Sequence, residues 1–252
     1  MRLQNKVAIV TGAGSGFGEG IARRFALEGA KIVIADINVA AGQRVAGEIS
    51  ASGGVAEFVE TDVSRSDSMA KLLQATLKAF GALDIVINNA GTTHRNRPLL
   101  DVDEREFDRI YAVNVKSIYL SAQHFVPHFR KVGGGAFVNV ASTAAVRPRP
   151  GLTWYNGSKG AVVVISKSMA AELAPEKIRV NCVNPVMGPT GLMQDFMGVP
   201  DTPENRAKFM ATIPMGRFSS PADVANACLY LASDEAAFIT GVSIEVDGGR
   251  CI

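Results

Sequence analysis

The stretch TGAGSGFG, Thr11 to Gly18, decides the fold of this chain. It follows the β-branched run VAIV and opens an amphipathic stretch, GEGIARRFALEG. Its glycines Gly12, Gly16 and Gly18 permit a positive φ angle, a close approach of backbone to a phosphate and tight helix–strand packing. A helix that begins here offers free N–H groups and a partial positive charge to an anion. The spacing predicts a dinucleotide-binding turn, although a tight strand-to-helix turn without a ligand remains the alternative.

Short apolar runs alternate with longer amphipathic stretches along the rest of the chain. Such nearly continuous apolar runs are typical of strands buried on both faces of a parallel sheet. The pattern predicts one α/β domain over residues 1–252, a Rossmann-type doubly wound sheet of seven mainly parallel strands with helices on both faces. The predicted strands are Lys6–Val10, Lys31–Ala35, Val55–Val59, Leu83–Asn88, Gly135–Val140, Lys177–Val183 and Ser243–Asp247.

Composition excludes several classes of protein. The 252 residues carry a formal net charge of only +2, which gives no general attraction to nucleic acid or an anionic membrane. No apolar run approaches the ~20 residues that cross a bilayer, and the N-terminus leads into a strand rather than a signal peptide. The three cysteines form no C-x-x-C pair, and His124 and His128 lack a third ligand. We therefore expect a cytoplasmic protein with a small-molecule substrate and no metal, nucleic-acid or membrane partner.

Residues 187–217 interrupt the alternation with several prolines, glycines and methionines. They follow the sixth predicted strand at its carboxyl end, where ligands bind in such sheets. We interpret the segment as a mobile substrate lid, with a static surface loop as the alternative. Its methionines are expected either to form an adaptable substrate wall with Trp154 or to pack against the lid's own core; they include Met187, Met193, Met197 and Met210.

Asp36 ends the second predicted strand, 18 residues after Gly18. A carboxylate there accepts hydrogen bonds from an adenosine ribose. It also repels the extra phosphate of NADP, since two like charges about 4 Å apart repel by ~4 kcal/mol at an effective dielectric near 20. Neither Ser15, Ile37 nor Asn38 supplies a compensating cation. The sequence predicts NAD(H) over NADP(H), with a helix N-cap as the alternative role of Asp36.

Further motifs follow in order along essentially the whole chain. They are DV at Asp62–Val63, NNAG at Asn88–Gly91, Asn114 in a long helix over Glu104–Lys131, Ser142, YNGSK at Tyr155–Lys159, NPVMGPT at Asn184–Thr190 and VDGG at Val246–Gly249. Together with TGAGSGFG, this set resembles the short-chain dehydrogenase/reductase family. The sequence departs from the family in having Pro185–Val186 where P-G is usual, Gly188 where a bulkier residue is common, and Gly157 in place of alanine.

The resemblance implies a set of site residues. It makes Asn114, Ser142, Tyr155 and Lys159 the catalytic group, with Asn114 holding a water that links Lys159 to solvent. Asp62 and Val63 would hold the adenine, and Thr190 the carboxamide. The implied cofactor-binding residues are Gly12, Ser15, Gly16, Phe17, Gly18, Asp36, Ile37, Asp62, Val63, Asn89, Ala90, Gly91, Tyr155, Lys159, Pro185, Val186, Gly188 and Thr190.

Tyr155 and Lys159 lie four residues apart, and so face the same way on a helix. A nearby cation lowers the pKa of a phenol, so we expect Tyr155 to exchange protons with a substrate oxygen while Ser142 holds that oxygen. A ring packed on a lysine stem, and a loop hydroxyl, are the structural alternatives.

The predicted function is NAD-linked hydride transfer between the nicotinamide and a secondary alcohol or ketone, such as a cyclic alcohol or a sugar. A 3-oxoacyl-carrier-protein reductase, with Arg130 and Lys131 on an acidic carrier, is one alternative. A non-catalytic NAD-binding sensor or scaffold is another. Arg147 and Arg149 either steer an acidic substrate or face solvent or a neighbouring subunit.

The helix after Tyr155, AVVVISKSMAAELA, is apolar on nearly every face. One side must cover the sheet, and the other is too apolar for water. We expect it to pack on its copy in a homotetramer, with the helix over Glu104–Lys131 beside it and the tail VDGGRCI at a second interface.

Overall fold

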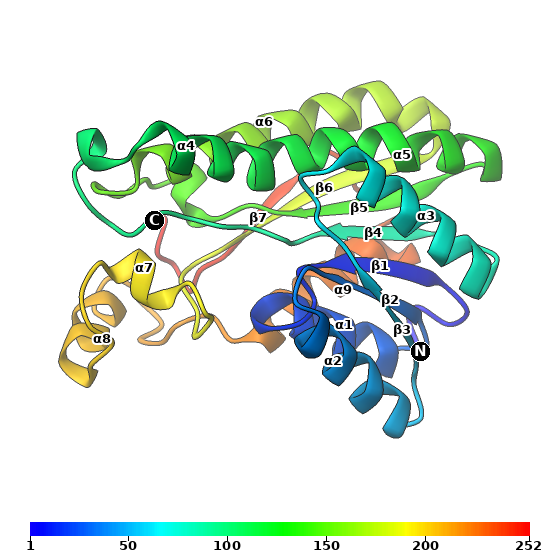
Figure 1. Ribbon diagram of the computed structural model, residues 1–252, viewed down its shortest axis with the longest axis horizontal. Coiled ribbons are helices and arrows are strands. Elements are labelled where there is room, and N and C mark those ends of the chain that lie inside the picture. The colour runs from blue at the N-terminus through cyan, green and yellow to red at the C-terminus, as the bar shows by residue number, and fades with distance from the viewer.

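The computed structural model describes all residues, 1–252, and contains one sheet of seven parallel strands in the order β3-β2-β1-β4-β5-β6-β7 (Figure 1). The strands are β1 (Val7–Thr11), β2 (Lys31–Asp36), β3 (Val55–Glu60), β4 (Ile85–Asn88), β5 (Gly135–Val140), β6 (Ile178–Pro185) and β7 (Ser243–Val246). The order reverses between β1 and β4, and ligands bind outside the carboxyl ends of strands at such a reversal. The predicted doubly wound fold is confirmed.

Helices cover both faces of the sheet (Figure 1). One layer contains α1 (Gly16–Leu27), α2 (Val39–Ala51) and α9 (Pro221–Ala232). The other contains α3 (Ser66–Phe80), α4 (Glu104–Tyr111), α5 (Ser117–Val132) and α6 (Thr153–Leu173). Each layer buries its own apolar cluster against the sheet, with Phe25 and Ile32 in the first and Phe129 and Phe137 in the second. The strands therefore need apolar side chains on both faces, which is the pattern seen in the sequence.

Two strands depart from that pattern. β3 and β7 form the two edges of the sheet, and neither contains a fully buried residue. In β3 the side chains of Val55 and Glu57 are exposed, while Ala56 and Phe58 pack against the core. The expectation of burial on both faces was wrong for these edges, because only one neighbouring strand and fewer helices cover them.

The predicted long helix over Glu104–Lys131 is also interrupted. A π-helical turn over Ala112–Lys116 separates α4 from α5. Such a turn adds a residue to the helix and is found frequently at functional sites. It carries Asn114, whose side chain it presents toward α6.

Residues 187–217 lie beyond the carboxyl end of β6, as expected, and contain two short helices, α7 (Met193–Met197) and α8 (Pro203–Met210). Both lie at the end of the molecule where the C-terminus also lies (Figure 1). This places the segment and the tail beside the carboxyl ends of β5 and β6.

Candidate active site

The turn between β1 and α1 is held against the loop after β4. A Cβ atom on Gly18 would lie 2.1 Å from the carbonyl oxygen of Gly12, and one on Gly12 would lie 2.9 Å from Cα of Ala90. Gly12 also has a φ of +63°, which side chains other than glycine's rarely adopt. The Asn89 amide donates to the carbonyl oxygens of Thr11, at 2.9 Å, and Gly12, at 3.2 Å. The turn is thus a fixed cradle of backbone that fits a dinucleotide phosphate.

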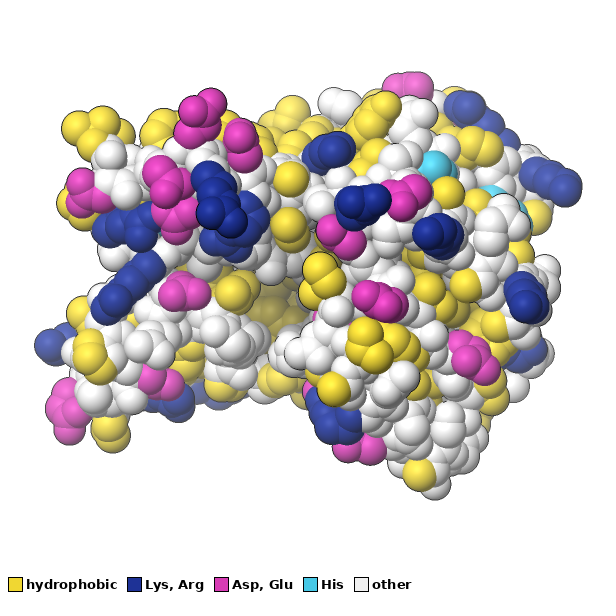
Figure 2. All heavy atoms as spheres, viewed as in Figure 1, with side chains coloured by type: hydrophobic (Ala, Val, Ile, Leu, Met, Phe, Trp, Pro, Cys, Tyr) yellow, Lys and Arg dark blue, Asp and Glu magenta, His cyan; other side chains and the backbone are white.

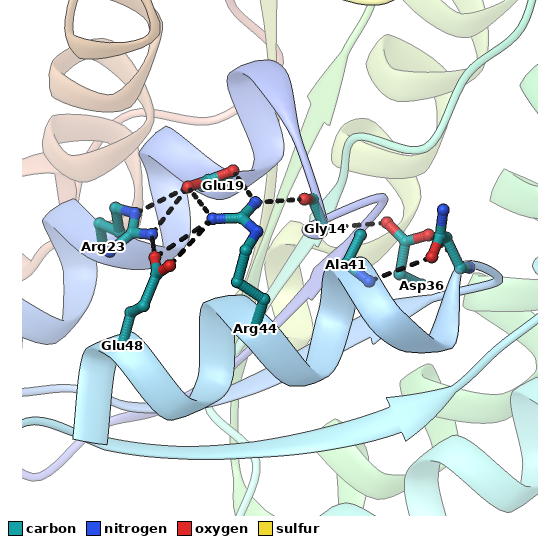
Figure 3. Close-up of polar contacts among 8 residues, drawn as sticks. Gly14, Glu19, Arg23, Asp36, Ala41, Arg44 and Glu48 are labelled. Atoms are coloured by element: carbon teal, nitrogen blue, oxygen red, sulfur yellow. Dashed lines mark hydrogen bonds and ion pairs between the residues drawn. The ribbon is translucent and has the colours of Figure 1, made fainter. Parts of the chain in front are cut away.

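Asp36, at the end of β2, holds the outer side of this cradle (Figure 3). Its carboxylate accepts from the backbone N–H of Gly14 at 2.8 Å and of Asn38 at 2.8 Å. The helix-cap alternative is not what the structure shows, because the side chain of Asn38 accepts from Ala41 and caps α2. Asp36 is therefore free to present its remaining lone pairs to the cavity.

A charged network ties α1 to α2 behind the cradle (Figure 3). Arg44 donates to Glu19 at 2.7 Å, to Glu48 at 3.1 Å and to the carbonyl oxygen of Gly14 at 3.0 Å. Arg23 binds the same two carboxylates. The hydrogen bond from Arg44 lowers the pKa of the Glu19 carboxyl. Arg44, the cation nearest to the cradle, was not predicted as part of the site. It lies eight residues after Asp36 along the chain, a distance that gives no sign of spatial proximity.

A single cavity of about 920 Å³ runs from this cradle to the segment that contains α7 and α8. Figure 2 shows a hollow lined by hydrophobic atoms in the middle of the face drawn. Every predicted site residue lines the cavity except Gly18 and Asn114. Gly18 packs beneath the cradle, and Asn114 lies on the far side of Gly91 from the cavity, beside Lys159.

Tyr155, Ser142 and Lys159 meet midway along this cavity. Tyr155 and Lys159 are 6% and 5% exposed, and Nζ of Lys159 lies 6.0 Å from the centre of the tyrosine ring. Lys159 donates to the carbonyl oxygen of Val140 at 2.8 Å, so it is not simply a stem for the ring to pack on. The Ser142 hydroxyl accepts from the N–H of Ala144 at 3.1 Å and lies next to the phenol.

The protonation of this pair differs from the expectation. Burial raises the pKa of Tyr155 to about 12, and the neighbouring Ser142 hydroxyl offsets only part of that rise. Burial also lowers the pKa of Lys159 to about 8. The pKa of the phenol is thus raised, where the sequence predicted that Lys159 lowers it. Burial dominates, and the cation whose charge does lower this pKa is Arg149.

Asn114 joins three elements. Its amide donates to the carbonyl oxygen of Thr92 at 2.9 Å and to the Ser158 hydroxyl at 2.9 Å, and its oxygen accepts from the N–H of Thr92 at 2.8 Å. A Cβ atom on Gly91 would lie 3.4 Å from Nζ of Lys159 and 3.5 Å from Oδ1 of Asn114. Asn114 thus lies beside Lys159, in a position that the resemblance implied but the helical pattern alone did not.

The departures from the family pattern have packing partners. A Cβ atom on Gly188 would lie 2.6 Å from the ring of Phe17, so the phenylalanine of the cradle fills the space of the missing side chain. A Cβ atom on Gly157 would lie 3.0 Å from the hydroxyl of Tyr111. Both glycines therefore make room for an aromatic side chain elsewhere in the chain.

The far end of the cavity has apolar walls. Phe196 packs on Tyr155 with ring centres 5.0 Å apart, and Phe209 and Leu192 also line the cavity. Of the four methionines considered, only Met187 and Met197 reach the cavity. Trp154 was expected to contribute but lies outside it, where its indole N–H donates to the carbonyl oxygen of Leu99.

Arg250, from the tail after β7, also lines this end. The sequence analysis placed the tail only at a subunit interface, and nothing in the short run VDGGRCI indicated that the guanidinium turns inward. No three histidine, cysteine or acidic side chains lie close enough together to hold a metal ion. None of the helices has both the length and the apolar character to span a bilayer.

The chain was compared with known proteins. Residues 12–250 match the family described as enoyl-(acyl carrier protein) reductase. A 4-formylbenzenesulfonate dehydrogenase of Comamonas testosteroni is 53% identical over 252 residues, which is 100% of both chains. A 2,5-dichloro-2,5-cyclohexadiene-1,4-diol dehydrogenase of Sphingobium indicum is 37% identical over 248 residues, 98% of this chain and 97% of that protein.

A solved structure is also very similar. The 3-ketoacyl-(acyl-carrier-protein) reductase from Brucella melitensis, complexed with NADH, aligns with a TM-score of 0.93 at 48% identity and covers 99% of this chain and 100% of that one. These matches span the whole chain, including the glycine cradle and the Ser142, Tyr155 and Lys159 cluster. This chain belongs to the short-chain dehydrogenase/reductase family of Rossmann-fold oxidoreductases.

Proposed function

We propose that this protein is an NAD(H)-dependent oxidoreductase that transfers a hydride between the nicotinamide and a secondary alcohol or ketone. One observation carries the proposal. The same cavity is lined by the glycine cradle and Asp36 at one end and by Ser142, Tyr155 and Lys159 in the middle. A dinucleotide bound along it would bring its reactive ring to the tyrosine, and that ring accepts or donates the hydride.

The residues of this chain handle the substrate oxygen and its proton. In the oxidation direction, the hydride leaves the carbinol carbon for the nicotinamide while Tyr155 accepts the hydroxyl proton. Ser142, beside the phenol, holds the substrate oxygen with a hydrogen bond. Lys159 is fixed by the carbonyl oxygen of Val140, and Asn114 lies next to it, in a position to hold a water through which the proton leaves.

The protonation of Tyr155 in the free protein suits the proton transfer of ketone reduction. With a pKa of about 12, Tyr155 is protonated at neutral pH and is therefore a proton donor to a ketone. Oxidation requires the phenolate, which a nearby positive charge stabilises. Lys159, with a pKa of about 8, is still mostly charged at pH 7. We therefore expect alcohol oxidation to become faster as the pH rises above neutrality, because the base must lose its proton.

Asp36 supports a preference for NAD over NADP. Its carboxylate lines the cavity while both of its oxygens accept from backbone N–H groups. The nearest cation, Arg44, is bound to Glu19 and Glu48, so it does not neutralise the 2′-phosphate of NADP.

The two curated relatives support a ring in the substrate. By name, one acts on 4-formylbenzenesulfonate and the other on a cyclohexadiene diol, so the reacting group is attached to a ring in one and lies within a ring in the other. The apolar walls formed by Phe196, Phe209 and Leu192 provide flat surfaces for such a ring. We take a ring-bearing alcohol as the substrate class. The diol of one relative has secondary hydroxyls on its ring, whereas the formyl group of the other corresponds to a primary alcohol.

The 3-oxoacyl-carrier-protein reductase alternative is favoured by the name of the similar solved structure. Against it, Arg130, one of the two residues considered for a carrier, is bound to Glu176 at 2.8 Å. Acetoacetyl-coenzyme A reduced more efficiently than any ring ketone would favour that alternative.

We further propose that the protein is a homotetramer and that residues 187–217 act as a lid over the substrate. Tyr119 on α5 and Val164 on α6 are 58% and 64% exposed, and a shallow apolar hollow lies between these helices. Light scattering at micromolar concentration tests the tetramer; a monomer would contradict it.

The proposed activity is tested by NADH formation from a panel of cyclopentanol, 1-phenylethanol and sugars, with NAD and NADP compared for each. We expect oxidation of at least one ring alcohol and a higher kcat/KM with NAD. If Tyr155→Phe were as active as the unchanged protein, the catalytic assignment would be wrong. If no alcohol or ketone reacted while NADH still bound, the sensor or scaffold alternative would be favoured.

A further inference from the structure

The charged residues that line the cavity are distributed unequally. The only carboxylates are Asp36 and Asp62, both at the adenosine end. Beyond Tyr155, the lining contains four cations and no acidic residue; these cations are Arg147, Arg149, Lys208 and Arg250. None of the four takes part in an ion pair. The substrate end of the cavity therefore carries unbalanced positive charge.

Arg149 follows β5 and enters the cavity beside the catalytic tyrosine. Its guanidinium makes one hydrogen bond, to the carbonyl oxygen of Phe196 at 3.3 Å, and lies 5.1 Å from the centre of the Phe209 ring. Burial and then the charge of Arg250 lower the pKa of Arg149, while Tyr155 raises it. Both arginines and Tyr155 line the same cavity, and the charge of Arg250 reaches Arg149. A guanidinium has five N–H donors, so most of those of Arg149 remain without a partner in the protein.

Arg250 reaches the same place from the tail. Its Nη1 atom is enclosed by protein atoms and has no hydrogen-bond partner, while other atoms of the residue line the cavity. Leaving such a donor unpaired is costly, and each instance in a folded protein calls for a reason. The backbone of the tail is fixed, because Arg147 donates to the carbonyl oxygen of Arg250 at 2.6 Å. Asp247, the nearest acidic residue in the tail, accepts from the N–H groups of Gly249 and Cys251 and is not paired with Arg250.

We propose that Arg149 and Arg250 bind an anionic group of the substrate, a carboxylate or a sulfonate, on the side of the ring away from the reacting carbon. The inference rests on the proposed function and narrows its substrate class to ring alcohols and ketones that carry such an acid. Planar guanidinium groups match the paired oxygens of these acids. The ring of the substrate lies between the acid and the reacting carbon, against Phe196 and Phe209.

Arg147 and Lys208 have a different position. Both are exposed, and Arg147 already donates to the tail. Because both side chains are exposed, they lie near the opening of the cavity. Their positive potential raises the rate at which an anion enters.

The test compares a matched pair of substrates, 4-(1-hydroxyethyl)benzoate and 4-(1-hydroxyethyl)benzamide, which differ in charge but hardly in shape. We expect kcat/KM to be about 100-fold higher for the benzoate, with the difference mainly in KM. Arg149→Gln and Arg250→Gln should each reduce this preference by about 10- to 100-fold, which is the effect of losing one charge-assisted hydrogen-bonding partner. Arg149→Lys should restore part of it.

The control variant is Arg105→Gln, which removes an exposed arginine of α4 that takes no part in an ion pair or side-chain hydrogen bond. It should leave the preference unchanged. Equal kcat/KM for the benzoate and the benzamide in the unchanged protein would overturn the inference but leave the proposed function standing. A second measurement is independent of turnover: benzenesulfonate should raise the Tm of the unchanged protein and of Tyr155→Phe, and should do so much less in Arg149→Gln. If no alcohol reacted but this shift were present, the proposed function would fail while the anion site remained.

Discussion

The two ends of the cavity differ in how their charges are balanced. At the adenosine end, Glu19, Arg23, Arg44 and Glu48 bind one another, and Asp36 is held by two backbone N–H groups (Figure 3). At the substrate end, Arg149 and Arg250 have no acidic partner, and one nitrogen of Arg250 has no partner at all.

The paired charges at one end stabilise the structure, whereas the unpaired charges at the other end are available to bind a ligand. Charges that satisfy one another in the free protein keep the cradle rigid, and they leave little free charge for a ligand. Charges without partners in the free protein raise its free energy until a ligand of opposite sign binds.

Tyr155→Phe should reduce turnover by about 10²- to 10⁴-fold, the usual contribution of a general acid or base. Only the hydroxyl is removed, and the ring keeps its packing on Phe196. NADH binding, followed by fluorescence, should be within a factor of a few of the unchanged protein. Turnover within tenfold of the original would show that another group transfers the proton.

Asp36→Asn combined with Glu19→Gln should shift the ratio of kcat/KM for NADP to that for NAD by about 100-fold toward NADP. The first change removes the repulsion of the 2′-phosphate. The second removes one of the two carboxylates that bind Arg44 and leaves only Glu48, so that the guanidinium is freer to bind the phosphate. Glu19→Gln alone should have little effect on the ratio, because Asp36 still repels the phosphate. If the two changes had purely additive effects on this kcat/KM ratio, Glu19 would not be what keeps Arg44 from binding the phosphate.

Lys159→Met should alter the pH dependence of stability. The pKa of Lys159 is lowered from 10.5 to about 8 by burial, so between these values the unfolded chain keeps a proton that the folded chain has lost. The stability of the unchanged protein therefore rises with pH over this window, and Tyr155, whose pKa is raised, opposes it only above about pH 10. From pH 7.5 to 9.5 the unchanged protein should gain about 1–2 kcal/mol relative to Lys159→Met. A constant difference in Tm over this range would mean that Lys159 keeps its charge.

The smallest expected effects are on protein stability, and they should differ in sign between the two ends of the cavity. Arg44→Gln should lower the Tm slightly, because an exposed network with several partners is lost. Arg149→Gln should raise the free energy of unfolding by about 1 kcal/mol, because a largely unpaired and desolvated charge is removed. For a chain of this length, that gain corresponds to a rise in Tm of about 2–4 °C. Destabilisation by both substitutions would contradict the contrast between the two ends.

The fold and the glycine cradle could be predicted because their signals are local, whereas most of the site residues were implied by the family resemblance. The glycine spacing of TGAGSGFG, the apolar runs and the four-residue step from Tyr155 to Lys159 each follow from backbone geometry. The position of Arg250 could not be predicted, because it depends on how a short tail crosses the end of the sheet. Arg44 was missed because its eight-residue distance from Asp36 along the chain gave no local signal.

The pKa of Tyr155 shows a different limit. The sequence indicates which charge lies one helical turn away, but it does not show how deeply both groups are buried. Burial proved the larger effect in the free protein. The π-helical turn that carries Asn114 could not be predicted either, because the sequence around it has the pattern of an ordinary helix.

The most direct test of the account is a crystal structure with NADH and 4-(1-hydroxyethyl)benzoate bound together. The account predicts that the adenosine ribose binds Asp36, the substrate hydroxyl lies between Ser142 and Tyr155, and the carboxylate lies between Arg149 and Arg250. A carboxylate that faced solvent, or a hydroxyl out of reach of Tyr155, would contradict it.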